Sequence, residues 1–63
     1  MKLRPGLHVM DQRGRTMRLA TRVKIAGRKG WEAQELPTGR TLYVLDTEIV
    51  ASKVAEGYQL ILA

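Results

Sequence analysis

The 63-residue chain contains no cysteine, no phenylalanine and a single histidine. The absence of cysteine excludes disulfide bonds and thiolate metal sites, and His8 alone cannot hold a structural zinc ion. Chains of this size bury only about 60% of the surface that they expose when unfolded, so disulfide bonds, metal ions or self-association commonly stabilise them. Efficient packing or self-association must therefore stabilise this chain, and we expect no metal.

Long hydrophobic runs are also missing. No segment approaches the roughly 20 consecutive apolar residues of a membrane-spanning helix. Near the N-terminus, Pro5, Gly6 and Asp11 interrupt the apolar run that a signal peptide requires. We therefore expect a cytoplasmic protein without membrane contact, folded as one small domain over residues 1–63.

The sequence offers few combinations of side chains that could catalyse a reaction. A nucleophile needs a nearby base, and His8 lies in a predicted strand where it should face solvent. Glu32 and Glu35 fall on opposite faces of a regular strand, so they cannot share a proton. We expect no enzymatic activity and no cofactor. The one enzymatic alternative is an active site formed at an oligomer axis and lined by Tyr43, Gln34 or Gln59.

The most informative segment is Thr16–Ile25, where apolar and cationic residues alternate. Successive side chains of a strand point to opposite faces. The pattern therefore predicts one face directed to a core and one face carrying a row of positive charge. The apolar set is Met17, Leu19, Val23 and Ile25, and the cationic set is Arg18, Arg22 and Lys24.

Positive charge is concentrated in the first half of the chain. Residues 1–29 contain nine cations and one acid, a net charge of +8, whereas residues 30–63 contain two cations and five acids, a net charge of −3. A one-sided basic distribution is typical of proteins that bind nucleic acids or other polyanions. A merely solubilising surface is the alternative explanation.

Short segments separated by glycine predict a small antiparallel meander. Strands are expected at residues 7–10, 16–25, 31–36, 40–45 and 58–62. A hairpin turn is expected at residues 27–30, and a second turn at residues 37–39, where proline and glycine favour it.

Residues 46–55 are ambiguous. Asp46 or Thr47 could cap a short helix or helical turn, which we favour, but the β-branched residues that follow also suit a strand. The closing segment contains the apolar run 60–62. This run indicates either an ordinary last strand or a homodimer interface formed by Tyr58, Leu60, Ile61 and Leu62.

The opening segment LRPGLHVM, residues 3–10, leads through Pro5-Gly6 into a strand containing Val9. With the longer strand, the hairpin and the helical turn that follow, it resembles a small bacterial Src-homology-3-like barrel of the KOW type. The resemblance implies a mainly β fold, with five antiparallel strands in a partial barrel and a short helix or helical turn before the last strand. Members of this group bind RNA, DNA, ribosomal elements, RNA polymerase or other proteins.

These patterns predict a non-enzymatic nucleic-acid-binding accessory or regulatory protein that contacts phosphates electrostatically, and RNA and DNA are both compatible with them. The alternative is an interaction module that docks on a larger acidic protein. Arginine predominates among the cations, as suits bidentate phosphate contacts. The ring of Trp31, beside the basic turn, could stack on a base or belong to the core. The candidate binding residues are Arg13, Arg15, Arg18, Arg22, Lys24, Arg28, Lys29 and Trp31.

Overall fold

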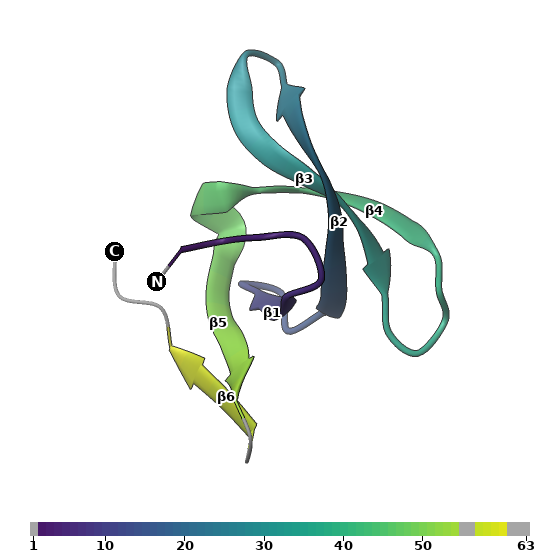
Figure 1. Ribbon diagram of the computed structural model, residues 1–63, viewed down its shortest axis with the longest axis vertical. Coiled ribbons are helices and arrows are strands. Elements are labelled where there is room, and N and C mark those ends of the chain that lie inside the picture. The colour runs from purple at the N-terminus through teal and green to yellow at the C-terminus, as the bar shows by residue number, and fades with distance from the viewer. Residues whose placement is uncertain (1, 55–56, 61–63) are drawn as a thin grey trace.

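A computed structural model describes residues 2–54 and 57–60 of the chain. In them, six antiparallel strands form one open sheet, ordered β4-β3-β2-β1-β5-β6 (Figure 1). The strands are β1 (His8–Asp11), β2 (Thr16–Ile25), β3 (Arg28–Glu35), β4 (Thr41–Leu45), β5 (Ile49–Val54) and β6 (Gly57–Leu60). The prediction of a mainly β chain is confirmed, but the structure has six strands where five were expected.

The first four strands form a meander, and β5 then returns to pair with β1 on the side that β2 does not occupy. A 3-10 turn, η1 (Asp46–Glu48), makes this return possible between β4 and β5. The described residues contain no helix that is long and apolar enough to cross a membrane.

Of the short helix or helical turn predicted within residues 46–55, the structure has the helical turn η1, and the strand alternative holds from Ile49 onward. Ile49, Val50 and Val54 belong to β5, because β-branched side chains pack well on a pleated sheet and lose rotamer freedom in a helix. The helical turn therefore precedes two strands, β5 and β6, and not the last strand alone.

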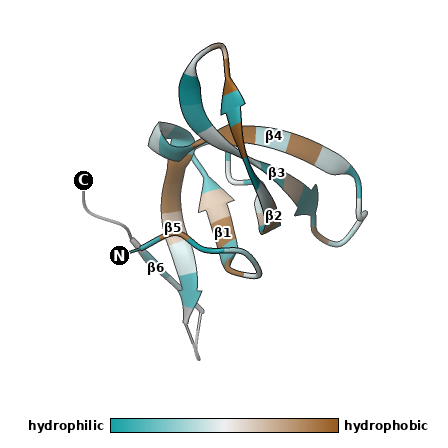
Figure 2. Cartoon of the chain, turned by 45° about the horizontal axis from the view of Figure 1, so that its top comes forward, coloured by the Kyte–Doolittle hydropathy of each residue, from teal (hydrophilic) through white to brown (hydrophobic). Residues whose placement is uncertain are grey.

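The core is formed by residues of β1 to β5, and apolar residues of these strands are brown in Figure 2. Trp31 is its largest side chain and is 2% exposed. Leu3, Leu7 and Leu42 pack against the rim of the cluster. The buried apolar residues of this core are Val9, Met17, Leu19, Trp31, Ala33, Val44 and Ile49.

The predicted dimer interface falls mainly outside the described residues. Tyr58 lies on β6 and is 37% exposed. Ile61 and Leu62 are outside the described part of the chain, as is the side chain of Leu60. Self-association through this segment stays a prediction.

Candidate nucleic-acid interface

The hairpin formed by β2 and β3 extends beyond the rest of the sheet and forms the arm at the top of Figure 1. The pairing of β3 with β4 ends at Gly30, and the pairing of β2 with β1 ends at Arg18. Residues 24–29, here named the hairpin tip, therefore pair only with one another in the described structure.

The chain reverses at Ala26 and Gly27, which both have positive φ angles, 51° and 79°. Two consecutive residues in this conformation form a type I′ turn, whose twist matches that of the adjoining strands. The prediction that the turn spans residues 27–30 is wrong, since β3 begins at Arg28. Gly30 lies within the strand, where a Cβ atom would come within 2.7 Å of Ile25 Cδ1 and 2.8 Å of the Val44 carbonyl oxygen.

The hairpin tip carries three cations and no acid. Lys24 and Lys29 lie directly opposite each other across the two strands, and Arg28 lies opposite Ile25. All three cations are exposed. Within residues 2–54 and 57–60, none of them forms a salt bridge, although Arg28 Nη2 donates a hydrogen bond of 3.3 Å to Thr47 Oγ1. Directly opposed like charges destabilise a sheet, so the Lys24–Lys29 pair destabilises the folded protein when no ligand is bound.

A β-bulge divides the cations of β2 between the two faces of the hairpin. Leu19 pairs with Ala33 and Thr21 with Glu32, which leaves Ala20 as an extra residue in β2. Such a residue reverses the alternation of the side chains that follow it. The predicted common face for Arg18, Arg22 and Lys24 is therefore wrong, since Arg18 pairs with exposed Gln34 and Arg22 with buried Trp31. Val23 and Ile25, predicted to face the core, lie half-buried on the face opposite to Trp31.

Arg22 is fixed at the base of the arm. Its guanidinium forms a salt bridge with Asp46 of η1, and its Cζ atom lies 4.7 Å from the centre of the Trp31 ring. The hydrogen bond to Asp46, with a smaller contribution from that carboxylate's charge, raises the pKa of Arg22. The side chain thus joins the hairpin to η1, and its charge is already compensated.

Trp31 cannot serve as a stacking platform in this conformation. It is buried, and the guanidinium of Arg22 covers a face of its ring. The interpretation of Trp31 as a core residue is confirmed. Its indole Nε1 has no hydrogen-bond partner among the described residues.

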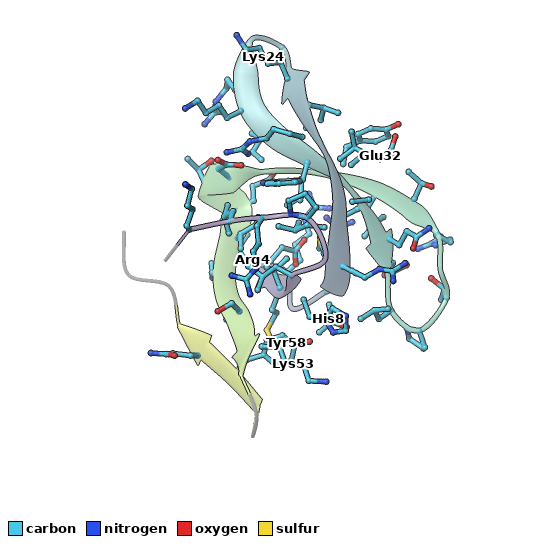
Figure 3. All side chains as sticks on the ribbon, in the orientation of Figure 1. Arg4, His8, Lys24, Glu32, Lys53 and Tyr58 are labelled. Carbon is cyan, nitrogen blue, oxygen red and sulfur yellow. The ribbon has the colours of Figure 1, made fainter. Side chains whose placement is uncertain are left out.

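The other face of the hairpin is of mixed polarity. Arg18 donates a hydrogen bond to the side chain of Gln34, and Tyr43 donates one of 3.2 Å to Glu32 Oε1. This hydrogen bond, followed by the negative charge of Glu32, raises the pKa of Tyr43. Glu32 lies to the right of the arm in Figure 3, well below Lys24 at the tip.

Arg13 and Arg15 lie in the β1–β2 turn, at the opposite end of β2 from the tip. The buried carboxylate of Asp11 accepts hydrogen bonds from the backbone N–H groups of both residues, at 3.0 and 2.9 Å. Arg15 Nε donates a further hydrogen bond of 2.8 Å to Asp11 Oδ2, and Arg15 Nη2 lies 2.8 Å from the same oxygen in a salt bridge. Arg15 therefore compensates a buried charge and shapes this turn, while the side chain of Arg13 is exposed.

The structure thus brings together only part of the predicted set. Lys24, Arg28 and Lys29 share the hairpin tip, Arg22 and Trp31 form its base, and the remaining candidates lie on the other face or in the distant turn. Sequence reasoning missed Asp46 and Thr47, which contact the arm from η1. No local pattern marks them, because they lie 24 and 19 residues away from their partners.

The described residues contain no group of three or more histidine, cysteine, aspartate or glutamate side chains that could hold a metal ion. Comparisons of the chain with protein-family models, with curated proteins and with solved structures find no match.

Proposed function

We propose that this chain is a non-enzymatic nucleic-acid-binding protein that contacts the phosphate backbone with its hairpin tip. The observation that carries the proposal is the exposed cross-strand pair Lys24–Lys29, neither member of which forms a salt bridge among the described residues. Folding gains nothing from this pair, since the two charges repel. An anionic ligand would bind between the two ammonium groups and relieve the repulsion.

The fold supports a binding role of this kind. We infer a distant likeness to small Src-homology-3-like barrels from the meander, the turn η1 and the return of β5 to β1. Such scaffolds host many ligands, so the choice of partner depends on the surface that the scaffold presents. Here the hairpin tip presents three exposed cations, none of which forms a salt bridge among the described residues.

The cations at the tip have the chemistry that phosphate binding requires. Arg28 can donate two parallel hydrogen bonds to one phosphate, and each lysine supplies a compact positive charge. Each phosphate that is neutralised releases counterions, so the affinity should fall steeply with added salt. Arg22 and Trp31 position the arm, and we assign them no direct phosphate contact.

The test of this proposal compares the nucleic-acid affinities of two variants, Lys24→Glu at the hairpin tip and Lys53→Glu elsewhere. Both substitutions change the net charge by the same amount. Lys53 is exposed on β5 and lies at the opposite end of the molecule from Lys24 (Figure 3). We expect Lys24→Glu to weaken nucleic-acid binding about tenfold or more, since one contact is lost and a repulsion is added. Lys53→Glu should change the affinity by less than about twofold, because a distant charge is screened.

Fluorescence anisotropy of labelled oligonucleotides measures both affinities. Equal losses in the two variants would mean that net charge alone drives binding and that the tip is not the site. An absence of binding by the unaltered protein at low salt would overturn the proposal and leave an acidic protein as the expected partner.

A further inference from the structure

The shape of the hairpin tip selects among nucleic acids. From the last pair shared with the sheet, Val23 and Gly30, the arm continues through two more cross-strand pairs and a two-residue turn. At about 3.4 Å per residue, this corresponds to a projection of roughly 10 Å. The major groove of B-form DNA is about 8.5 Å deep and 12 Å wide, and it admits a two-stranded β-ribbon.

The cations lie on both faces of this ribbon. Lys24 and Lys29 share one face, whereas Arg28, one residue nearer the turn, belongs to the other. Its exposed hydrogen bond of 3.3 Å to Thr47 Oγ1 would be exchanged for a phosphate contact. A ribbon inside a groove has one phosphate backbone on each side. This division, which follows from the alternation of successive side chains in a strand, therefore suits a ligand with two flanking backbones better than a single strand lying across one face.

Binding of single strands usually depends on exposed aromatic rings on which bases stack. The chain has three aromatic residues, and none is available at the tip. Trp31 is buried beneath Arg22, and Tyr43 donates its hydroxyl to Glu32, whose charge would repel a phosphate. Tyr58 lies on β6, four strands from β3 in the sheet order.

We propose that the hairpin tip enters the major groove of duplex DNA, with Lys24 and Lys29 facing one phosphate backbone and Arg28 facing the other. This inference rests on the proposed function and narrows its ligand. Double-stranded RNA fits less well, since the major groove of an A-form helix is deep and too narrow for side chains to enter.

The experiment titrates the full chain against three labelled ligands of equal length, each about two helical turns or roughly 20 nucleotides per strand. The ligands are duplex DNA, one of its single strands and the matched RNA duplex, at an ionic strength of about 0.1 M. We expect the DNA duplex to bind at least about tenfold more tightly than the other two. Comparable or tighter binding of the single strand or the RNA duplex would overturn the inference but leave the proposed function intact, whereas no binding of any ligand would overturn both.

A second measurement locates the protein on the duplex. Dimethyl sulfate methylates guanine N7, an atom of the major groove. Bound protein should protect N7 atoms within its site, and Lys24→Glu should abolish the protection at the same protein concentration. Binding without protection of any guanine N7 would place the protein outside the major groove and overturn the inference.

Discussion

At the scale of single residues, Ala20 has the largest effect on the surface of the hairpin. As the extra residue of a bulge, it reverses the alternation of β2 and places Arg22 and Lys24 on the face opposite to Arg18. Its position in the register decides which cations act together, and sequence reasoning could not see it because a bulge depends on the partner strand.

Glu35 shows how a single carboxylate can hold a turn. Its Oε1 atom accepts hydrogen bonds from Arg40 Nε and Nη2 at 3.1 and 3.0 Å and from Thr38 Oγ1 at 3.1 Å. The hydrogen bonds from Arg40, followed by the one from Thr38, lower the pKa of Glu35 from its ordinary value of 4.5. These contacts connect the end of β3 to the segment that leads into β4.

A lowered pKa in the folded state means that ionised Glu35 stabilises the fold above its unfolded pKa. This contribution is lost as the pH falls through the folded value. We expect Glu35→Gln to lower the urea midpoint at pH 7 and to lower it less at about pH 3, because the native carboxylate gains protons as the pH falls through its folded pKa. Fluorescence of the single tryptophan, Trp31, reports unfolding. The same difference in midpoint at both pH values would contradict an ionic role for Glu35.

At the scale of elements, the turn of the β2–β3 hairpin combines a favourable and an unfavourable residue. Gly27 adopts its positive φ without strain, whereas Ala26 holds a φ of 51°, which is unfavourable for a residue with a Cβ atom. The turn forms nevertheless, because the pairing of the two long strands, from Met17–Glu35 to Ile25–Arg28, determines its length.

Asparagine is strongly preferred at the first position of a type I′ turn. We expect Ala26→Asn to increase the free energy of unfolding by about 0.5–1 kcal/mol, because asparagine tolerates the left-handed conformation better than alanine. Urea unfolding followed by Trp31 fluorescence measures the change. Ala26→Val is the matched control and should destabilise the protein, since a branched side chain is strained at positive φ. A loss of stability in Ala26→Asn would show that the turn is not type I′.

At the scale of the whole molecule, the excess of positive charge is distributed unevenly between paired and unpaired groups. Arg15, Arg22 and Arg40 form salt bridges with Asp11, Asp46 and Glu35. The cations of the hairpin tip have no such partner in the described structure. Other exposed cations, such as Arg13 and Lys53, also have no salt bridge among the described residues, but the hairpin tip places three of them on one projecting arm.

This arrangement predicts opposite effects of one substitution on stability and on binding. Lys24→Glu replaces a repulsive cross-strand pair with an attractive one, so the free energy of unfolding should rise by about 0.2–1 kcal/mol. The same variant should bind nucleic acid more weakly, as proposed above. Urea unfolding of the free protein provides the measurement, with Lys53→Glu as the control for net charge. Unchanged or lower stability in Lys24→Glu would contradict the repulsion between Lys24 and Lys29.

Much of the fold could be predicted from the sequence because its signals are local. Alternation of side chains predicted the strands, and glycine and proline marked the turns between them. The burial of Trp31 was one of two interpretations that the sequence left open. After Asp46 the sequence left a short helix or helical turn and a strand open, because capping residues and β-branched residues compete there. The pairing of β5 with β1 limits the helical part to the turn η1.

The sequence by itself determined that this protein is mainly β, basic in its first half and without cysteine chemistry. Those properties follow from residue types and from the alternation of side chains along a strand. Both can be seen in the sequence without knowing which segments pair. The tertiary structure decided which cations share a face, that Arg15 and Arg22 are held by Asp11 and Asp46, and that Lys24 opposes Lys29 on a projecting arm. The physical reason is that registers, bulges and salt bridges depend on which distant segments meet, and those contacts form only when the sheet assembles.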